Sequence, residues 1–170
     1  MDHNSGEGVE DMRLHPDADI IPNHSLGGLK LRTRLYDVQD LIVGVGMLGK
    51  VSFALTGPFV AVYRFADSEI ALAVDVRNGQ IFRLTAYPGY RGSLFGKLRV
   101  GMRVAEAMEL DPRLFYNEAE GFICCSGVAG LVIDIPEIDP PPDQVPQMMI
   151  SAISVYAAEI NTLEGQRGKW

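Results

Sequence analysis

The residues that most resemble a chemical motif form a glycine run, Gly44-Val45-Gly46-Met47-Leu48-Gly49-Lys50. This run matches the dinucleotide-binding pattern G-x-G-x-x-G and the first seven positions of the phosphate-binding pattern G-x-x-x-x-G-K-[ST]. A dinucleotide loop needs a strand before the glycines, a helix at the third glycine and an acid about 20 residues later. The candidate strand is Leu41 to Val43, and the candidate acid is Asp67.

Two features argue against a nucleotide site. The segment from Val51 to Phe59 is short, rich in β-branched and aromatic residues, and closed by Thr56-Gly57-Pro58, so it predicts no helix whose first amides would bind a phosphate. Val51 also stands where a phosphate loop has its magnesium-binding Ser or Thr, although Ser52 follows it. We interpret the run as a glycine-permitted bend and turn that links a helix to a sheet. A nucleotide-binding protein or enzyme that uses Gly44 to Lys50 is the alternative function.

Other reactive residue types do not form recognisable sites. His3, His15 and His24 are too scattered in the sequence for a metal site or a catalytic dyad, and Ser126 lacks the flanking G-x-S-x-G frame of a nucleophile elbow. Adjacent side chains of a strand point to opposite faces, so we expect Cys124 and Cys125 to be free thiols, without a disulfide or a metal. The sequence predicts no catalytic residues, no metal and no cofactor.

Length and composition set broad limits. The 170 residues, 47% hydrophobic and 22% charged, suit one compact domain or two small modules that share a core. A net charge of -7 argues against nucleic acid as a partner and suits solubility or a basic partner. No apolar stretch approaches the roughly 18 to 20 residues that cross a bilayer. Residues 1–19 are polar and acidic, unlike a signal peptide, so we expect a flexible tail and a cytoplasmic protein.

A pattern of strand and helix occurs twice, 69 residues apart. Leu29-Lys30-Leu31 and the helix pattern from Arg34 to Ile42 return as Leu98-Arg99-Val100 and the segment from Arg103 to Leu110. Gly27 and Gly96 occupy equivalent positions before the two strands. A duplication is the simplest explanation, and it predicts helices that begin near Arg34 and Arg103.

Alternating segments after each helix predict two β-meanders. The first comprises Val60–Phe65, Ile70–Val76 and Ile81–Ala86, with a hairpin turn at Asn78-Gly79, and the second comprises Leu114–Tyr116, Gly121–Cys125 and Leu131–Ile135. Residues 43–58 have no counterpart in the second copy, so we expect function or irregular structure there. Pro140-Pro141-Pro142 predicts a stiff connector, followed by a short helix at 143–149 and a strand at 152–156. One helix over 145–160 is the alternative.

The predicted fold is therefore α+β. It has two repeated modules, each a short strand and a helix followed by an antiparallel β-meander, and together they form a joined sheet. We place the first module at residues 20–92, the second with its proline-rich exit loop at 93–160, and a C-terminal tail at 161–170.

Two groups of residues are candidates for binding a protein partner. Acidic residues gather in the second module and its exit loop, where they form either a solvated face or a docking surface for a basic protein. Aromatic residues with an arginine flank the junction of the modules, where they either pack the modules together or contact a partner. The candidate residues are Tyr87, Tyr90, Arg91, Tyr116, Glu118, Glu120, Glu137 and Asp139.

The segment Leu98-Arg99-Val100-Gly101-Met102-Arg103-Val104-Ala105-Glu106-Ala107-Met108 resembles the helix-opening motif of β-lactamase-inhibitor-protein-like and SmpA-type lipoprotein modules. With the duplication, the resemblance covers residues 27–135. It implies two modules side by side whose sheets form a continuous surface for gripping another protein. The Tyr87 to Gly92 linker and the proline-rich exit also make the arrangement similar to small bacterial immunity proteins.

Two departures limit what this resemblance implies. The first copy has Arg32-Thr33 where the motif has Gly-Met, and the sequence shows neither a secretion signal nor a lipidation cysteine. We therefore expect a non-catalytic inhibitor of cytoplasmic, bacterial origin: an immunity protein that neutralises a cognate toxin or effector. A structural or regulatory subunit is a further alternative.

Overall fold

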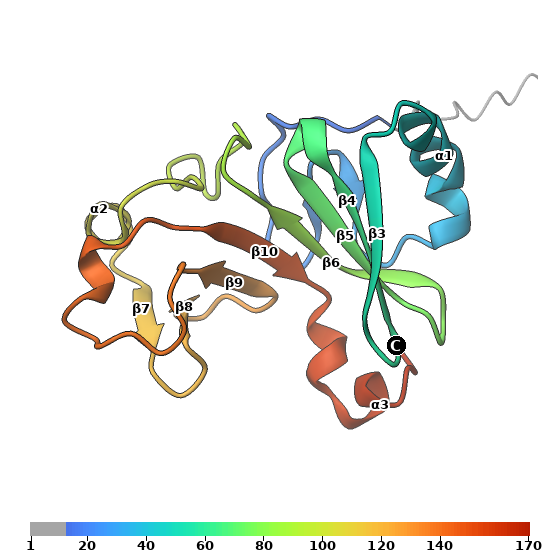
Figure 1. Ribbon diagram of the computed structural model, residues 1–170. Coiled ribbons are helices and arrows are strands. Elements are labelled where there is room, and N and C mark those ends of the chain that lie inside the picture. The colour runs from blue at the N-terminus through green and yellow to red at the C-terminus, as the bar shows by residue number, and fades with distance from the viewer. Residues whose placement is uncertain (1–12) are drawn as a thin grey trace, which may run out of the picture.

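A computed structural model describes residues 13–170 and shows an α+β fold organised around a single large antiparallel sheet (Figure 1). The sheet has eight strands in the order β3-β4-β5-β6-β10-β9-β8-β7, and β1 pairs with β2 in a separate hairpin. This confirms the α+β class. The expected tail falls partly outside the described residues, but residues 13–19 are placed, and the amide of His15 donates to the Gly27 carbonyl at 2.8 Å.

The first half runs from the β1–β2 hairpin to β6. Its elements are β1 (Ser25–Leu26), β2 (Leu29–Lys30), a 3-10 turn (Leu35–Val38), α1 (Gln39–Met47), β3 (Val51–Gly57), β4 (Val60–Phe65), a 3-10 turn (Ala66–Ser68), β5 (Ile70–Asp75) and β6 (Gln80–Ala86). The three predicted strands match β4, β5 and β6. The segment expected to be irregular instead completes α1 and forms β3.

The second half runs from α2 to the C-terminus. Its elements are α2 (Val104–Leu110), β7 (Leu114–Asn117), β8 (Phe122–Cys125), β9 (Leu131–Asp134), a 3-10 turn (Val145–Gln147), β10 (Ala152–Tyr156), a 3-10 turn (Ala158–Asn161) and α3 (Leu163–Gln166). The final strand is confirmed, and the alternative of one helix over 145–160 is wrong. Ile153 and Val155 alternate into the core as strand residues do, and Pro146 limits the preceding helix to one 3-10 turn.

The helices begin where the sequence predicts. Arg34 and Arg103 are the residues before the first turns, and both have extended backbone angles. The backbone hydrogen bonds around them also recur 69 residues apart. Arg32 and Gly101 donate to the carbonyls of Ile81 and Ile150 at 2.8 Å. The amides of Ile81 and Ile150 donate back, to Thr33 and Met102, and Leu35 and Val104 donate to Gly79 and Met148.

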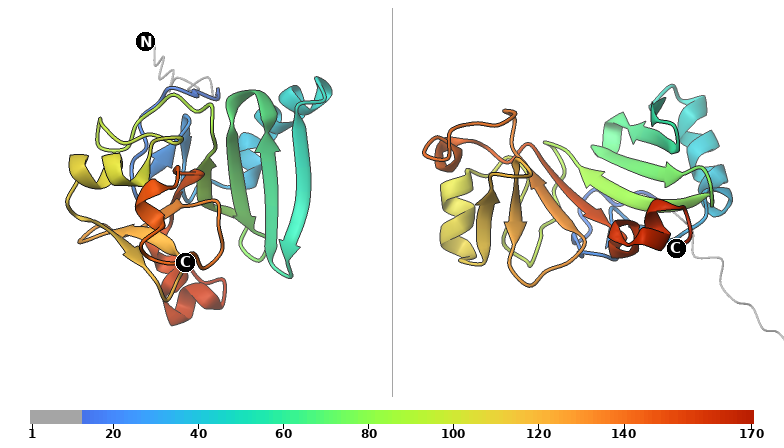
Figure 2. Two further views of the ribbon diagram at one scale, coloured as in Figure 1. Left: turned by 60° about the vertical axis from the view of Figure 1, so that its left-hand side comes forward. Right: turned by 90° about the horizontal axis from the view of Figure 1, so that it is seen from below.

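The pairing of β6 with β10 joins the halves and is called the seam below. Its register places Leu84 opposite Val155, Thr85 opposite Ser154 and Ala86 opposite Ile153. Figure 2 shows the strands of the first half and the strands β7 to β9 on opposite sides of β10. β6 and β10 are adjacent central strands of one sheet, so the backbone hydrogen bonds between them join the two halves.

The two faces of the sheet differ in side-chain size. One face carries fully buried aliphatic residues, among them Ile70, Leu72, Leu84, Ile133 and Ile153, and these join one core with residues of the N-terminal hairpin and α2. The other face carries small side chains on the same central strands, Ala71, Ala73, Ala152 and Ser154. This second face is where the described residues leave a groove.

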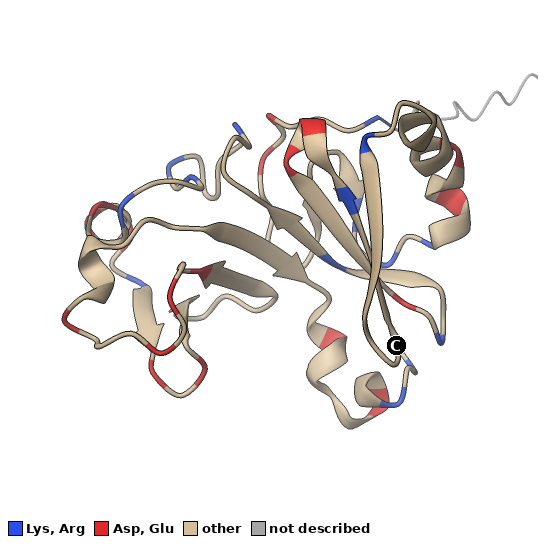
Figure 3. Ribbon diagram, in the orientation of Figure 1, with Lys and Arg blue, Asp and Glu red and all other residues tan. Residues whose placement is uncertain are grey.

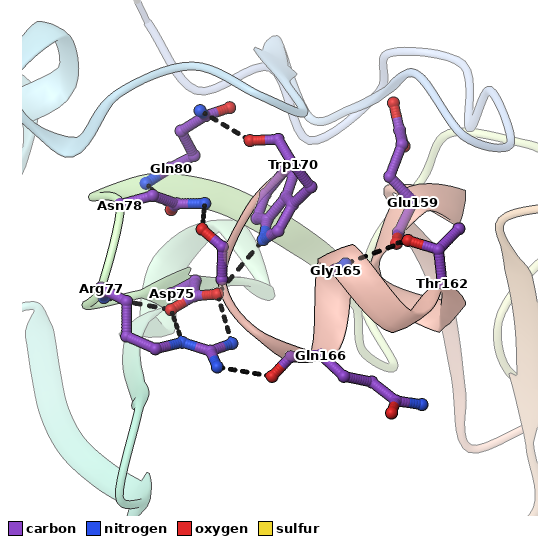
Figure 4. A network of polar contacts seen from close by, with 10 residues as sticks. Asp75, Arg77, Asn78, Gln80, Glu159, Thr162, Gly165, Gln166 and Trp170 are labelled. Carbon is purple, nitrogen blue, oxygen red and sulfur yellow. Dashed lines mark hydrogen bonds and ion pairs between the residues drawn. The ribbon is translucent and has the colours of Figure 1, made fainter.

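The C-terminal segment is held against the β5–β6 turn (Figure 4). Buried Asp75 accepts hydrogen bonds from Arg77 Nε at 2.8 Å and from Trp170 Nε1 at 3.1 Å. Arg77 Nη1 donates to the Gln166 carbonyl at 2.7 Å, and Gln80 Nε2 donates to the Trp170 carbonyl at 3.2 Å. Residues 161–170, expected as a tail, therefore pack on the first half. No helix within residues 13–170 has the length and apolar character that a bilayer crossing requires.

The Asp75 network predicts a pH-dependent contribution to stability. Hydrogen bonds from the Arg77 side chain hold the pKa of Asp75 below its ordinary value, against the opposing effect of burial. This stabilisation is present above the ordinary carboxyl pKa and is lost as the pH falls through the lowered folded-state value. Asp75→Asn should lower the free energy of unfolding by about 2 kcal/mol at pH 7, and the difference should shrink toward pH 3.

Urea unfolding at both pH values measures this contribution. Asp67→Asn is a matched control, because Asp67 is exposed and forms a surface ion pair with Lys50. It should change the free energy of unfolding by less than about 0.5 kcal/mol. Equal effects of the two substitutions at pH 7 would contradict the account of the Asp75 network.

Candidate partner-binding surface

A groove of about 250 Å³ opens on the second face of the sheet, over the seam. Its floor consists of small side chains from β5 and β10, and its polar lining includes Arg83, Thr85, Tyr87, Asp134 and Ser154. Thr85 and Ser154 lie opposite each other, and their hydroxyl oxygens are 2.9 Å apart. The groove therefore sits on the line where the two halves meet.

Arg83 and Asp134 place opposite charges at the groove. Arg83 Nη2 lies 3.8 Å from Asp134 Oδ2, and both side chains are more than one third exposed. Arg83 Nε is buried and has no hydrogen-bond partner among the described residues. Burial raises the pKa of Asp134, and Arg83 opposes that shift. The ion pair between Arg83 and Asp134 is therefore long, and both side chains can form further hydrogen bonds.

Tyr87 lies at the groove with its ring covered by a cation. The Arg64 guanidinium carbon is 4.2 Å from the ring centroid, and Arg64 Nη2 is 3.6 Å from Glu69 Oε2. The arginine over the Tyr87 ring is Arg64 from β4, which the sequence did not single out, and not the expected Arg91. Arg91 is exposed, and its backbone amide donates to the Pro16 carbonyl at 2.8 Å.

Tyr90 has a structural role that excludes side-chain contact with a partner in this conformation. It is 4% exposed, accepts a hydrogen bond from the Gly27 amide at 2.9 Å and donates to the Ala18 carbonyl at 2.6 Å. Burial raises the pKa of Tyr90 to about 12. The sequence could not distinguish this ring from an interface ring, because tyrosine suits both positions.

Acidic residues gather at the far end of the second half, on the loops beside β7 and β8 (Figure 3). Glu118 and Glu120 follow β7, and Glu137 and Asp139 follow β9; all four are exposed. None of these four carboxylates forms an ion pair or a side-chain hydrogen bond with a residue in the described part of the chain. Four unpaired negative charges therefore face solvent on two loops.

Tyr116 lies on β7, directly before the first of these loops. Burial raises the pKa of Tyr116, and the charges of Asp139 and Glu118 raise it further. The Tyr116 hydroxyl is buried and has no hydrogen-bond partner among the described residues. The structure thus brings together three candidate residues, while Tyr87 belongs to the groove at the seam.

Another acidic residue of the second half is structural. Asp111 is buried, accepts hydrogen bonds from Arg113 Nε at 2.9 Å and Nη2 at 2.8 Å, and lies 3.4 Å from Lys97 Nζ. Hydrogen bonds from Arg113 hold the pKa of Asp111 well below its ordinary value. This carboxylate is already neutralised inside the protein, so it adds nothing to an acidic docking surface.

The glycine run occupies the wrong elements for a dinucleotide loop. Leu41 to Val43 are helical, Gly44 and Gly46 lie inside α1, and only Gly49 adopts a left-handed φ, of 70°. The order is helix, glycines, strand, whereas a dinucleotide loop requires strand, glycines, helix. Asp67, the candidate ribose-binding acid, is ion-paired with Lys50.

The cysteines are free, with Cys125 buried and Cys124 half-buried. Burial raises the pKa of both thiols, which lowers the fraction of reactive thiolate. Within residues 13–170, no three His, Cys, Asp or Glu side chains group closely enough to hold a metal ion.

Comparisons with known proteins leave the family open. No family model matches the chain, and no curated protein matches its sequence. The crystal structure of the uncharacterized protein yfeY from Escherichia coli is similar over 62% of this chain and 79% of that chain, at 11% sequence identity and a TM-score of 0.44. A similarity of this size carries no argument about function.

Asp134 gives a test of the groove electrostatics. Because burial raises its folded-state pKa, its charge costs stability above that pKa, and the stability is fully present only below the ordinary carboxyl value. Asp134→Asn should therefore unfold at a higher urea concentration than the wild type at pH 7, and the difference should vanish near pH 3. Asp143→Asn, at an exposed carboxylate, serves as the control. A lower midpoint for Asp134→Asn at pH 7 would show that pairing with Arg83 outweighs burial.

Proposed function

We propose that the protein is a non-catalytic, protein-binding inhibitor, and more specifically a cytoplasmic bacterial immunity protein that neutralises a cognate toxin or effector. The observation that carries the proposal is the set of four exposed and unpaired carboxylates on the two loops around Tyr116. Within one chain, like charges on neighbouring loops repel one another without compensation. A basic partner provides that compensation when it binds.

The negative charge of this surface would speed association with a basic partner and select against acidic ones. A negative patch raises the rate of encounter with a positive patch and disfavours acidic partners, while contributing less to the final affinity than buried contacts do. Tyr116, on β7 directly before the first acidic loop, is half-buried, so part of its side chain is open to a partner. Tyrosine is among the residues that dominate binding energy in protein interfaces.

The groove at the seam offers a second contact on the same molecule. Its floor of small side chains lets a partner's side chain approach the sheet closely, and the exposed part of the Arg83 guanidinium is available to an acceptor. The hydroxyls of Thr85 and Ser154 pair with each other, so they are not arranged as a nucleophile beside a base. These features support binding more than turnover.

We further propose that the two halves are diverged copies of one module. The recurrence of backbone hydrogen bonds at a separation of 69 residues supports this. The same separation of 69 residues relates the two strands of the seam, because it matches Leu84, Thr85 and Ala86 with Ile153, Ser154 and Val155. The matched residues Thr85 and Ser154 also lie opposite each other in the sheet. A local two-fold axis between Thr85 and Ser154 relates the central strands and passes through the groove. A joined sheet with a binding surface is what the inhibitor-like resemblance implies.

Two other functions remain as alternatives with distinct tests. If Gly44 to Lys50 bound a nucleotide, calorimetric titration with ATP or NAD would release or absorb heat. Because Gly44 and Gly46 lie inside α1, we expect no binding heat. A structural or regulatory subunit predicts a stable complex with a protein that is not a toxin. The product of the neighbouring gene distinguishes this from an immunity protein, whose neighbour should encode a toxin domain.

The acidic loops give the decisive binding test. Replacing Glu118 and Glu120 by lysine should slow association with the neighbouring gene product and raise the dissociation constant about tenfold or more, about 1.4 kcal/mol. Glu106→Lys with Glu109→Lys is a matched control, since both residues are exposed on α2 and the change in net charge is equal. Surface plasmon resonance at low and physiological salt measures both rates.

Comparing the two variants distinguishes an effect of charge at the acidic loops from an effect of the net charge of the chain. Weakening by the loop variant alone supports the proposed surface, whereas equal weakening by both variants reflects only the net charge. Unchanged binding by the loop variant discards the surface. Failure of the wild-type chain to protect cells that express the neighbouring gene product discards the immunity function itself.

A further inference from the structure

α1 is an apolar helix after its first two residues, Gln39 and Asp40. From Leu41 to Met47 it contains no polar or charged side chain, and none of its nine residues is buried. Helices that are apolar on every side are normally enclosed by other elements, yet Met47 is 84% exposed. Leu41, Ile42 and Val45 pack against the core from one side of the helix, and the described chain leaves its other side, with Val43 and Met47, uncovered.

β3 adds an unprotected sheet edge beside this helix. It is the outermost strand and pairs only with β4. Because Ala66 donates its amide to the Lys50 carbonyl at 3.1 Å, the antiparallel register directs the backbone groups of Val51, Phe53 and Leu55 toward the free edge. Free edges are normally shortened or blocked by charge or proline. β3 has seven residues and contains neither, and its irregular register comes after Leu55.

The opposite edge of the sheet shows the usual protection. β7 has four residues, and the charged residues Arg113 and Glu118 stand at its two ends. β3 also has a charged residue and a proline at its ends, Lys50 and Pro58, but its seven residues leave a longer open edge than the four residues of β7 do. An open edge beside a helix with an uncovered side indicates that something adds to this end of the molecule.

The helix and the edge form one surface, which we call the α1–β3 patch. The Phe53 ring lies 5.1 Å from the Tyr63 ring, and Tyr63 lines a hollow of about 450 Å³ with Ile42 and Val43. The patch consists of large apolar or aromatic residues that are each more than half exposed: Tyr36, Val43, Met47, Leu48, Phe53 and Leu55. They expose roughly 800 Å², taking about 200 Å² for one large side chain. Each partner in a standard interface contributes about 800 Å².

A second copy of the chain fits this surface by symmetry. A two-fold axis perpendicular to the sheet at Ala54 pairs two β3 strands antiparallel and places Phe53 opposite Leu55 of the second copy. Such an axis keeps the apolar faces of both copies on one side and brings the two α1 helices together. Residues 41–49 and β3 carry no charge, so they offer nothing to a charged partner, and the exposed residues Asp37 and Asp40 come just before them in the sequence.

We infer that the protein forms a homodimer through the α1–β3 patch, by antiparallel pairing of two β3 strands about Ala54. This inference does not rest on the proposed inhibitor function. The acidic loops follow β7 and β9 in the other half of the sheet and stay accessible in the dimer. A dimer would therefore present two partner-binding surfaces.

Sedimentation velocity of the full chain from about 1 to 100 µM tests the dimer. The wild type should approach twice its mass of 18.6 kDa. Leu55→Lys should raise the dimer dissociation constant on the order of 100-fold, because each dimer buries two copies of this side chain. Met47→Lys should act in the same direction from α1. Both residues are exposed in the monomer, so circular dichroism should show both variants folded.

The matched control is Leu163→Lys, at an exposed leucine on α3. It should leave the dimer unchanged. A monomeric wild type at 100 µM overturns the inference, and so does a Leu55→Lys variant that dimerises like the wild type. The acidic-loop variant should remain dimeric, so a failure of partner binding and a failure of dimerisation are separate results.

Discussion

The antiparallel pairing of β6 with β10 is the contact on which the rest of the structure depends. It turns two groups of strands into one eight-stranded sheet, with Thr85 opposite Ser154 at its centre. Leu84, Ile153 and Val155 from these strands lie fully buried in the common core. The same pairing leaves small side chains on the opposite face, so the groove is a direct consequence of how the halves are joined.

The acidic residues fall into two kinds: buried carboxylates that are bonded to arginines, and exposed carboxylates that are open to a partner. Asp75 and Asp111 each accept hydrogen bonds from an arginine two residues later, and both are buried. Such carboxylates hold a turn and the following chain in place, because an unpaired buried charge would be costly. The carboxylates of Glu118 and Asp139 have no such partner and lie on loops. The net charge of the chain therefore overstates its internal repulsion, and its accessible part is concentrated near Tyr116.

Local sequence patterns predicted most of the strands and helices. Alternation within Val60–Phe65 and the Asn78-Gly79 turn were enough to predict β4 and the β5–β6 hairpin, because both signals arise between near neighbours in sequence. β3 was not predicted although Val51, Phe53 and Leu55 alternate, because Ala54 between them is also apolar and Gly57-Pro58 closes the segment, which weakens the period of two. The continuation of α1 through Gly44 and Gly46 was also missed, because glycine disfavours helix interiors and here the surrounding apolar residues outweigh that preference.

The candidate surface was predicted less completely, for a physical reason. The pairing of Arg83 with Asp134 depends on β6 and β9 both flanking β10, a long-range arrangement that no local pattern encodes. Burial of Tyr90 likewise depends on residues 13–27 crossing over it. The acidic loops were predictable, because charged residues between strands are exposed in most folds.

The most direct test of the central claim is amide hydrogen exchange of the chain alone and in complex with the neighbouring gene product. The account predicts that binding slows exchange in residues 117–121 and 136–143 and at the groove around Thr85 and Ser154, with little change in residues 158–170. Slowed exchange confined to residues 44–50, or no change in the two acidic loops, would contradict it.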